Sequence, residues 1–113
     1  MERVDLQAGL AFDEREHVQR FLAETPLSAI SVVGWEPGQV GKIHRHPRVD
    51  EIYHVLEGEG VFAEPGSELQ AGPGETLLFR AGEVHQVRSV TRMVLYRVHA
   101  GPDRTPEFFD DWP

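Results

Sequence analysis

The sequence contains no cysteine. Disulfide bridges, thiolate metal sites and cysteine nucleophiles are therefore excluded. It is also poor in basic residues: 11 Lys and Arg stand against 19 Asp and Glu, giving a net charge of -8. An acidic surface of this kind repels the phosphates of nucleic acids, so we expect no nucleic-acid partner.

Long apolar runs are lacking as well. No stretch approaches the roughly 18 residues that span a bilayer. The N-terminal residues 1–5 are mostly polar and contain nothing like the apolar segment of a secretory signal. We therefore expect a cytoplasmic protein with no membrane contact. The length of 113 residues fits one domain.

Turn-forming residues are plentiful. Eleven Gly and eight Pro are scattered along the chain, which is typical of short strands joined by turns. Residues 12–25 admit a short helix but follow neither the helical nor the strand period. The rest predicts an all-β antiparallel sandwich or barrel. We expect strands over 27–35, 40–46, 51–56, 61–63, 75–80, 84–90 and 93–99.

Four residues form a candidate metal site. His44 and His46 are two positions apart, so on a strand both imidazoles leave the same face, with Cα atoms roughly 6.5 Å apart. Residues 47–50 can turn the chain and return Glu51 beside them. His85 follows a second glycine-punctuated hairpin and joins the set only through tertiary folding. Three imidazoles and one carboxylate suit one divalent ion: Zn, Fe, Mn, Ni, Co or Cu.

The coordination number of that ion stays open. An octahedral ion would keep two positions for water or substrate, whereas a tetrahedral ion would be closed by the four side chains.

The spacing of these ligands resembles the first motif of the cupin superfamily. Gly38, the His44-x-His46 pair, Glu51 and Gly58 match its defining positions over residues 38–58.

Residues 74–89 resemble the second cupin motif less closely. Gly74, Gly82 and the ligand His85 match, whereas Arg80 replaces a proline and Ser89 an asparagine. These departures affect the hairpin shape and the pocket lining rather than the metal ligand.

The resemblance implies a single cupin domain over residues 1–113, folded as a double-stranded β-helix or jelly-roll barrel. Residues 1–25 would be an N-terminal extension and 101–113 a C-terminal tail. It also implies a homodimer, with His44, His46, Glu51 and His85 as metal ligands.

Several functions are compatible with such a domain. The first is a metal-dependent enzyme of the dioxygenase, isomerase, epimerase or decarboxylase type, acting on a small polar or carboxylate-bearing molecule. Its catalytic residue is not identified, although Glu51 is a candidate base. The alternatives are a non-catalytic module that binds or senses a small molecule, and a purely structural metal site.

Further residues are candidates for the pocket. Tyr53 and Val55 share the strand face of Glu51. Either Arg80 or Arg97 would suit a substrate carboxylate or phosphate, with a surface ion pair as the alternative. Barrel core packing is the alternative for the aromatic candidates, which also include Trp35, Phe79 and Tyr96.

The remaining histidines and the aromatic tail receive weaker assignments. His54 has the opposite parity to Glu51 and is expected to face away from the metal. His99 ends a strand and is expected at the rim, and His17 receives no role. The tail residues Phe108, Phe109 and Trp112 are expected to anchor the C-terminus on the barrel or on a second subunit.

Overall fold

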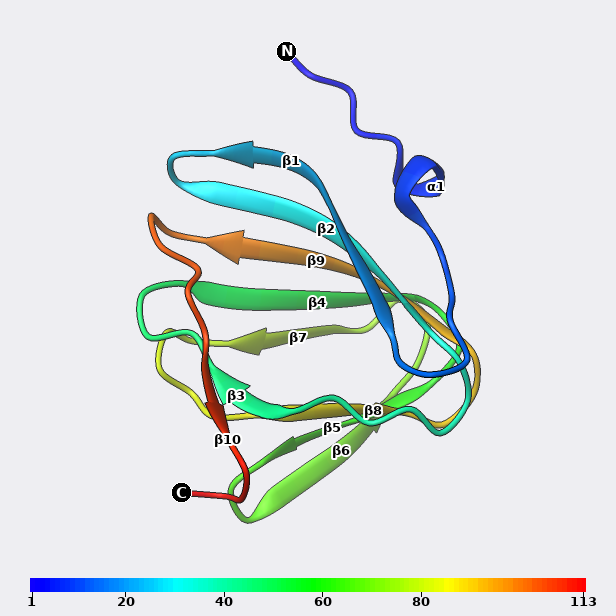
Figure 1. Ribbon diagram of the computed structural model, residues 1–113, viewed down its shortest axis with the longest axis vertical. Coiled ribbons are helices and arrows are strands. Elements are labelled where there is room, and N and C mark those ends of the chain that lie inside the picture. The colour runs from blue at the N-terminus through cyan, green and yellow to red at the C-terminus, as the bar shows by residue number, and fades with distance from the viewer.

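The computed structural model describes all 113 residues, and antiparallel strands make up most of it (Figure 1). The elements follow in the order α1 (Leu6–Gly9), β1 (Val18–Thr25), β2 (Ser28–Trp35), β3 (Ile43–Arg45), β4 (Asp50–Glu57), β5 (Gly60–Glu64), β6 (Ser67–Ala71), β7 (Thr76–Phe79), β8 (Gln86–Ser89), β9 (Met93–Ala100) and β10 (Glu107–Phe109).

The strands form two facing layers. One layer is a five-stranded sheet in the order β1-β2-β9-β4-β7. The other contains the three-stranded sheet β6-β5-β8 and the pair β10-β3, which lie opposite the first sheet in Figure 1. The all-β jelly-roll barrel predicted from the sequence is confirmed. No helix in the structure is long and apolar enough to cross a membrane.

Strand β4 shows how the core leads to the site. Its inward residues are Val55, Tyr53 and Glu51, which are at most 3% exposed. The inward row therefore passes from aliphatic to aromatic to charged along one strand. Burial of the apolar part supplies most of the stabilisation. The apolar cluster comprises Val33, Trp35, Tyr53, Val55, Phe62, Ala71, Phe79, Val87, Met93 and Leu95.

Glycines shape the turns that follow β4 and β7, where the chain passes from one layer to the other. Gly58 has φ of +75°, and a Cβ there would lie 1.9 Å from the carbonyl oxygen of Arg92. Only glycine fits that combination of conformation and close approach. Gly82, with φ of +85°, donates its N–H to the carbonyl of His46 at 2.8 Å. The turn after β7 is thereby attached directly to His46.

Three segments differ from the sequence expectation. Residues 18–25 form strand β1 rather than a helix, because they pair along the edge of β2. Strand β6 was not expected, since its side chains are exposed apart from Ala71 and mostly polar; pairing with β5 makes it a strand. Strand β10 was also not expected and pairs with β3. In each case tertiary pairing outweighs local propensity.

Candidate metal centre

Backbone pairing between β3 and the start of β8 brings the histidines together. His44 and His85 exchange two backbone hydrogen bonds: His44 N–H to His85 O at 3.0 Å, and His85 N–H to His44 O at 2.8 Å. His46 lies just beyond β3 on the same face as His44. Residues 41 positions apart in the sequence, His44 and His85, thus become direct neighbours.

The carboxylate of Glu51 lies at the centre of the predicted ligand set. This side chain is 1% exposed. Its Oε1 lies 2.5 Å from Nε2 of His85 and 3.4 Å from Nε2 of His44. Its Oε2 lies 3.2 Å from Nε2 of His46. The structure therefore brings the three predicted histidine ligands into contact with the carboxylate of Glu51.

A fifth residue, His99, also contacts this carboxylate. Strands β4 and β9 pair so that Glu51 lies opposite His99, and His99 Nε2 lies 2.7 Å from Glu51 Oε2. His99 is 2% exposed, so its expected position at the rim is wrong. A signal was present in the sequence, because His99 shares its strand face with Arg97 and Leu95.

Two overlapping triads therefore share Glu51: His44, Glu51 and His85 in one, and His46, Glu51 and His99 in the other. Within each triad the ligand atoms lie within 4.8 Å of one another, a spacing compatible with one bound ion.

The Nδ1 atoms of His44, His46 and His85 have hydrogen-bond partners, whereas that of His99 has none. Nδ1 of His44 lies 2.9 Å from the carbonyl oxygen of Lys42. Nδ1 of His46 and of His85 lie 2.7 Å and 3.0 Å from the carbonyls of Arg104 and Glu83. A carbonyl only accepts, so each of these Nδ1 atoms carries the hydrogen. In their neutral forms, all three Nε2 atoms therefore present lone pairs.

This arrangement fits a cation. The Nε2 lone pairs and the ionised carboxylate of Glu51 are all acceptors, so they approach one another favourably only around a positive charge. Carbonyl contacts to the remote nitrogen are the usual means by which metal-ligating histidines are oriented. His99 differs, because its Nδ1 is buried without a partner. Its hydrogen therefore belongs on Nε2, which donates to Glu51.

The pKa of Glu51 reflects the same surroundings. Burial acts to raise the pKa of this carboxyl, but its contacts with the four surrounding imidazoles outweigh burial and hold the pKa well below the usual range. For His99, burial lowers the pKa more than the contact with Glu51 raises it. The centre thus combines an ionised carboxylate with a neutral His99 near neutral pH.

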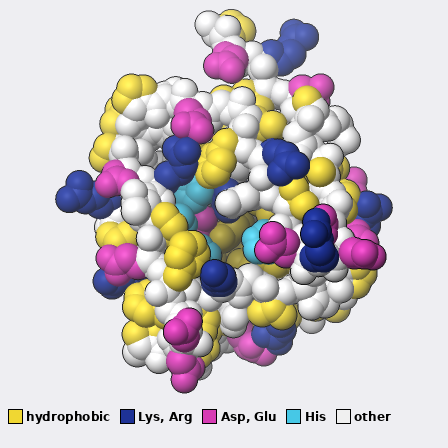
Figure 2. All heavy atoms as spheres, in the orientation of Figure 1, with side chains coloured by type: hydrophobic (Ala, Val, Ile, Leu, Met, Phe, Trp, Pro, Cys, Tyr) yellow, Lys and Arg dark blue, Asp and Glu magenta, His cyan; other side chains and the backbone are white.

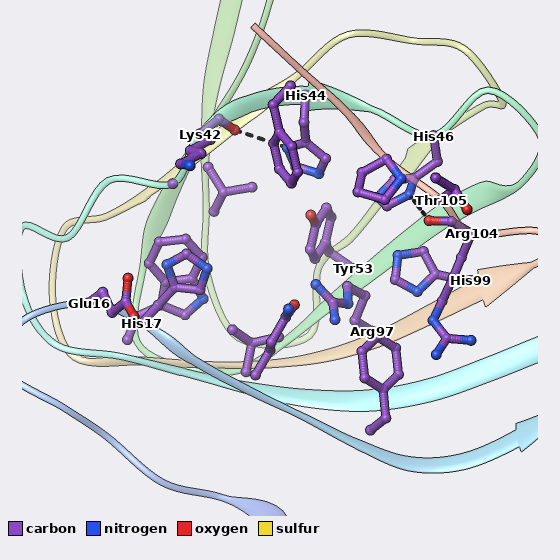
Figure 3. Close-up of a pocket in the computed structure, with 18 of the residues that line it drawn as sticks. Glu16, His17, Lys42, His44, His46, Tyr53, Arg97, His99, Arg104 and Thr105 are labelled. Atoms are coloured by element: carbon purple, nitrogen blue, oxygen red, sulfur yellow. Dashed lines mark hydrogen bonds between the residues drawn. The ribbon is translucent and has the colours of Figure 1, made fainter. Parts of the chain in front are cut away.

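A cavity of about 750 Å³ opens beside the centre. Figure 2 shows the hollow, with histidine side chains deep inside it, and Figure 3 shows His44, His46 and His99 around the cavity. Three of the predicted pocket residues line it: Trp35, Tyr53 and Arg97.

The other four predicted pocket residues do not line this cavity. Val55 lies within the apolar core. Phe79 lies behind the site, where its ring stacks on His85 with centroids 4.0 Å apart. Arg80 is exposed and pairs with Glu83. Tyr96 belongs to the outer face of β9, because it alternates with the buried Leu95 and Arg97. His54 faces away from the centre as expected and contacts Thr76.

The C-terminal tail completes one wall of the cavity. Strand β10 pairs with β3 so that Phe108 lies opposite His44. Phe108 lines the cavity, and Arg104 supplies the carbonyl that orients His46. The sequence left open whether the tail contacts the barrel or a second subunit, and the structure shows these contacts with the barrel of the same chain.

Comparison with known proteins identifies the family. The cupin domain family matches residues 31–99. This chain is a cupin. A solved protein from Klebsiella pneumoniae with a double-stranded β-helix domain has a TM-score of 0.89 at 18% identity, with 98% of this chain and 99% of that chain covered. An RmlC-like cupin protein from Desulfovibrio desulfuricans has a TM-score of 0.79 at 28% identity, over 88% and 96% of the two chains.

Among curated proteins, the cupin is similar to an oxalate-binding protein from Thermotoga maritima. The two are 34% identical over 53 residues, which is 47% of this chain. The match spans 44% of the length of that relative, so it covers less than half of either protein.

Proposed function

We propose that this cupin binds one divalent transition metal and acts with it on a small carboxylate-bearing molecule. The ligands in this proposal are His44, His46, Glu51 and His85. The observation that carries it is the set of three Nε2 lone pairs, each fixed by a carbonyl on the opposite nitrogen and directed at one buried carboxylate. A bound metal would supply Lewis-acid chemistry to a substrate oxygen.

Glu51 is better suited to bind the metal than to act as a general base. Its pKa is held well below the usual carboxyl range, and a weakly basic group removes protons inefficiently near neutral pH. The cupin resemblance implies a dioxygenase, isomerase, epimerase or decarboxylase. A reaction of any of these types must therefore use a proton acceptor other than Glu51, or proceed without one.

Elemental analysis tests this proposal. Protein purified without added metal should contain about one transition-metal ion per chain, and His46→Ala should lose it. His54→Ala is the matched control, because His54 lies on β4 but faces outward. Metal-dependent turnover in a screen of small carboxylates would establish the enzyme. Full metal content in His46→Ala would refute the ligand assignment.

The second candidate function is a non-catalytic metal-containing module that binds or senses a small molecule. The observation that favours it is the name of the Thermotoga maritima relative, which is described as binding oxalate. Saturable binding of a carboxylate without product formation would support this candidate. Product formation that requires the metal would support the enzyme.

We also propose that the protein is a cytoplasmic homodimer. The outer face of the five-stranded sheet supports the dimer, because Ile30, Val98, Ile52 and Leu78 lie side by side across four strands. None of the four is buried in the single chain. Apolar rows that stay partly exposed in the single chain often mark interfaces. Sedimentation as a monomer at micromolar concentration would contradict the dimer.

A further inference from the structure

Arg97 is a buried cation that lines the cavity beside the metal centre. It lies on β9, two positions before His99, and is 7% exposed. Its Nε donates to the hydroxyl of Ser31 at 2.8 Å. Its Nη2 is buried and has no hydrogen-bond partner. Figure 3 shows the guanidinium beside the cavity, near Tyr53 and His99.

Glu51 forms an ion pair with this guanidinium but accepts no hydrogen bond from it. Its Oε2 lies 4.0 Å from Arg97 Nε, which is too far for a hydrogen bond. That same oxygen is already in contact with His46 and His99. A buried charged donor without an acceptor is costly, and such groups in a cavity usually serve a ligand.

Trp35 is a second unpartnered donor in the same cavity. Its side chain is 3% exposed, and its indole Nε1 is buried without an acceptor. The ring is held in place by stacking on His17, with centroids 4.1 Å apart. Two unpartnered N–H donors indicate a cavity built for a ligand rich in oxygen rather than for an apolar one.

The balance of charge points to an anion. With a divalent ion bound, the fixed charges at the centre would be those of the ion, Glu51 and Arg97, which together leave a net positive charge. The histidines contribute none when neutral. A ligand with two negative groups would offset this charge, one at the metal and one at Arg97. The short distance between Arg97 and Glu51 requires that these groups be close together in the ligand.

We infer that Arg97 forms an anion subsite beside the metal, and that the ligand is a short dicarboxylate or a carboxylate carrying a second anionic group. This inference rests on the proposed function, because the first anionic group is assigned to the metal. Arg97 would be a specificity-determining residue that selects a second charge on the ligand.

Calorimetric binding of malonate and of its monoamide, malonamate, to the Mn²⁺-loaded protein tests the inference. Each probe has one carboxylate for the metal, but only malonate carries a second. The wild type should prefer malonate by about 10- to 100-fold, the range of a hydrogen bond between charged groups. Arg97→Gln should lose this preference, whereas Arg97→Lys should keep part of it.

Arg88→Gln is the matched control. Arg88 lies on β8 outside the cavity lining, and its guanidinium is paired with Glu68 at 3.1 Å. Its substitution should leave the preference for malonate unchanged. An equal affinity of the wild type for the two probes would overturn the inference, as would a full preference in a folded Arg97→Gln protein.

Metal analysis of the same samples separates this inference from the proposed function. A wild type without metal would refute the proposed function. In that metal-free protein, an Arg97-dependent preference for malonate would still support the subsite. One metal per chain, with no effect of Arg97 on the preference, would leave the proposed function standing and refute the subsite.

Discussion

Replacing His99 by leucine removes one hydrogen bond from the metal centre and leaves the other contacts of Glu51 in place. His99 Nε2 lies 2.7 Å from Glu51 Oε2, and its other nitrogen has no partner. We therefore treat His99 as a residue that positions Glu51 rather than as a metal ligand. His99→Gln can still donate a side-chain N–H, whereas His99→Leu cannot.

The expected magnitude follows from that contact. Loss of a group that orients a metal ligand typically weakens metal binding by 10- to 100-fold, or about 1.4 to 2.8 kcal/mol. Because Glu51 is 1% exposed, water cannot readily replace the lost donor. His99→Leu should fall in this range, and His99→Gln should lose less. The number of metal ions per chain should stay at one in both variants.

Competition titration with a chromophoric chelator measures these affinities, with His54→Leu as the control on the neighbouring strand. His54 contacts Thr76 at 2.7 Å but faces away from the site, so its loss should not change the affinity. If His99→Leu abolished stoichiometric metal, as His46→Ala is expected to do, His99 would be a ligand. An unchanged affinity in His99→Leu would remove it from the site altogether.

Three further predictions address stability. Gly66→Ala should lower the free energy of unfolding by about 1 to 2 kcal/mol, because Gly66 has φ of +78° and open space around it. Gly58→Ala should cost at least about 2 kcal/mol more, because its Cβ would overlap the backbone of Arg92. Urea unfolding compares the two variants, and equal losses of stability would contradict the packing argument. A chelator should lower the melting temperature of the metal-loaded protein, since an ion at 1,000 times its Kd adds about 4 kcal/mol; an unchanged melting temperature would contradict metal binding to the folded chain. Burial, followed by the charge of Arg97, lowers the pKa of His17 in the folded chain. The unfolded chain therefore binds more protons, and stability should fall as the pH drops through about 6.5. In urea unfolding at several pH values, His17→Gln should lose less stability than the wild type over that window, and an equal loss would contradict the role of His17.

The barrel and the four-residue constellation were predictable because both depend on strand parity and turn chemistry. Two alternate histidines leave one face of β3, and the turn over residues 47–50 returns Glu51 on β4 in the opposite layer, where it faces them. The positive φ of Gly58 follows from the tight turn after β4.

The features that the sequence did not predict depend on pairing between strands that are distant in the sequence. Parity with Leu95 places His99 on the inward face of β9, but parity does not show that β4 and Glu51 lie beside it. Phe79 was expected in the pocket but packs behind His85, since parity along β7 does not show which layer lies in front. The polar strand β6 becomes a strand only through β5. Long-range pairing of this kind carries little signal in a single sequence.

Anomalous diffraction at the absorption edge of the bound metal tests the central claim most directly. Crystals of protein purified without added metal should show one anomalous peak per chain. This peak should lie at bonding distance from a carboxylate oxygen of Glu51 and from the Nε2 atoms of His44, His46 and His85. A peak elsewhere, or no peak after soaking with each candidate transition metal, would contradict the account.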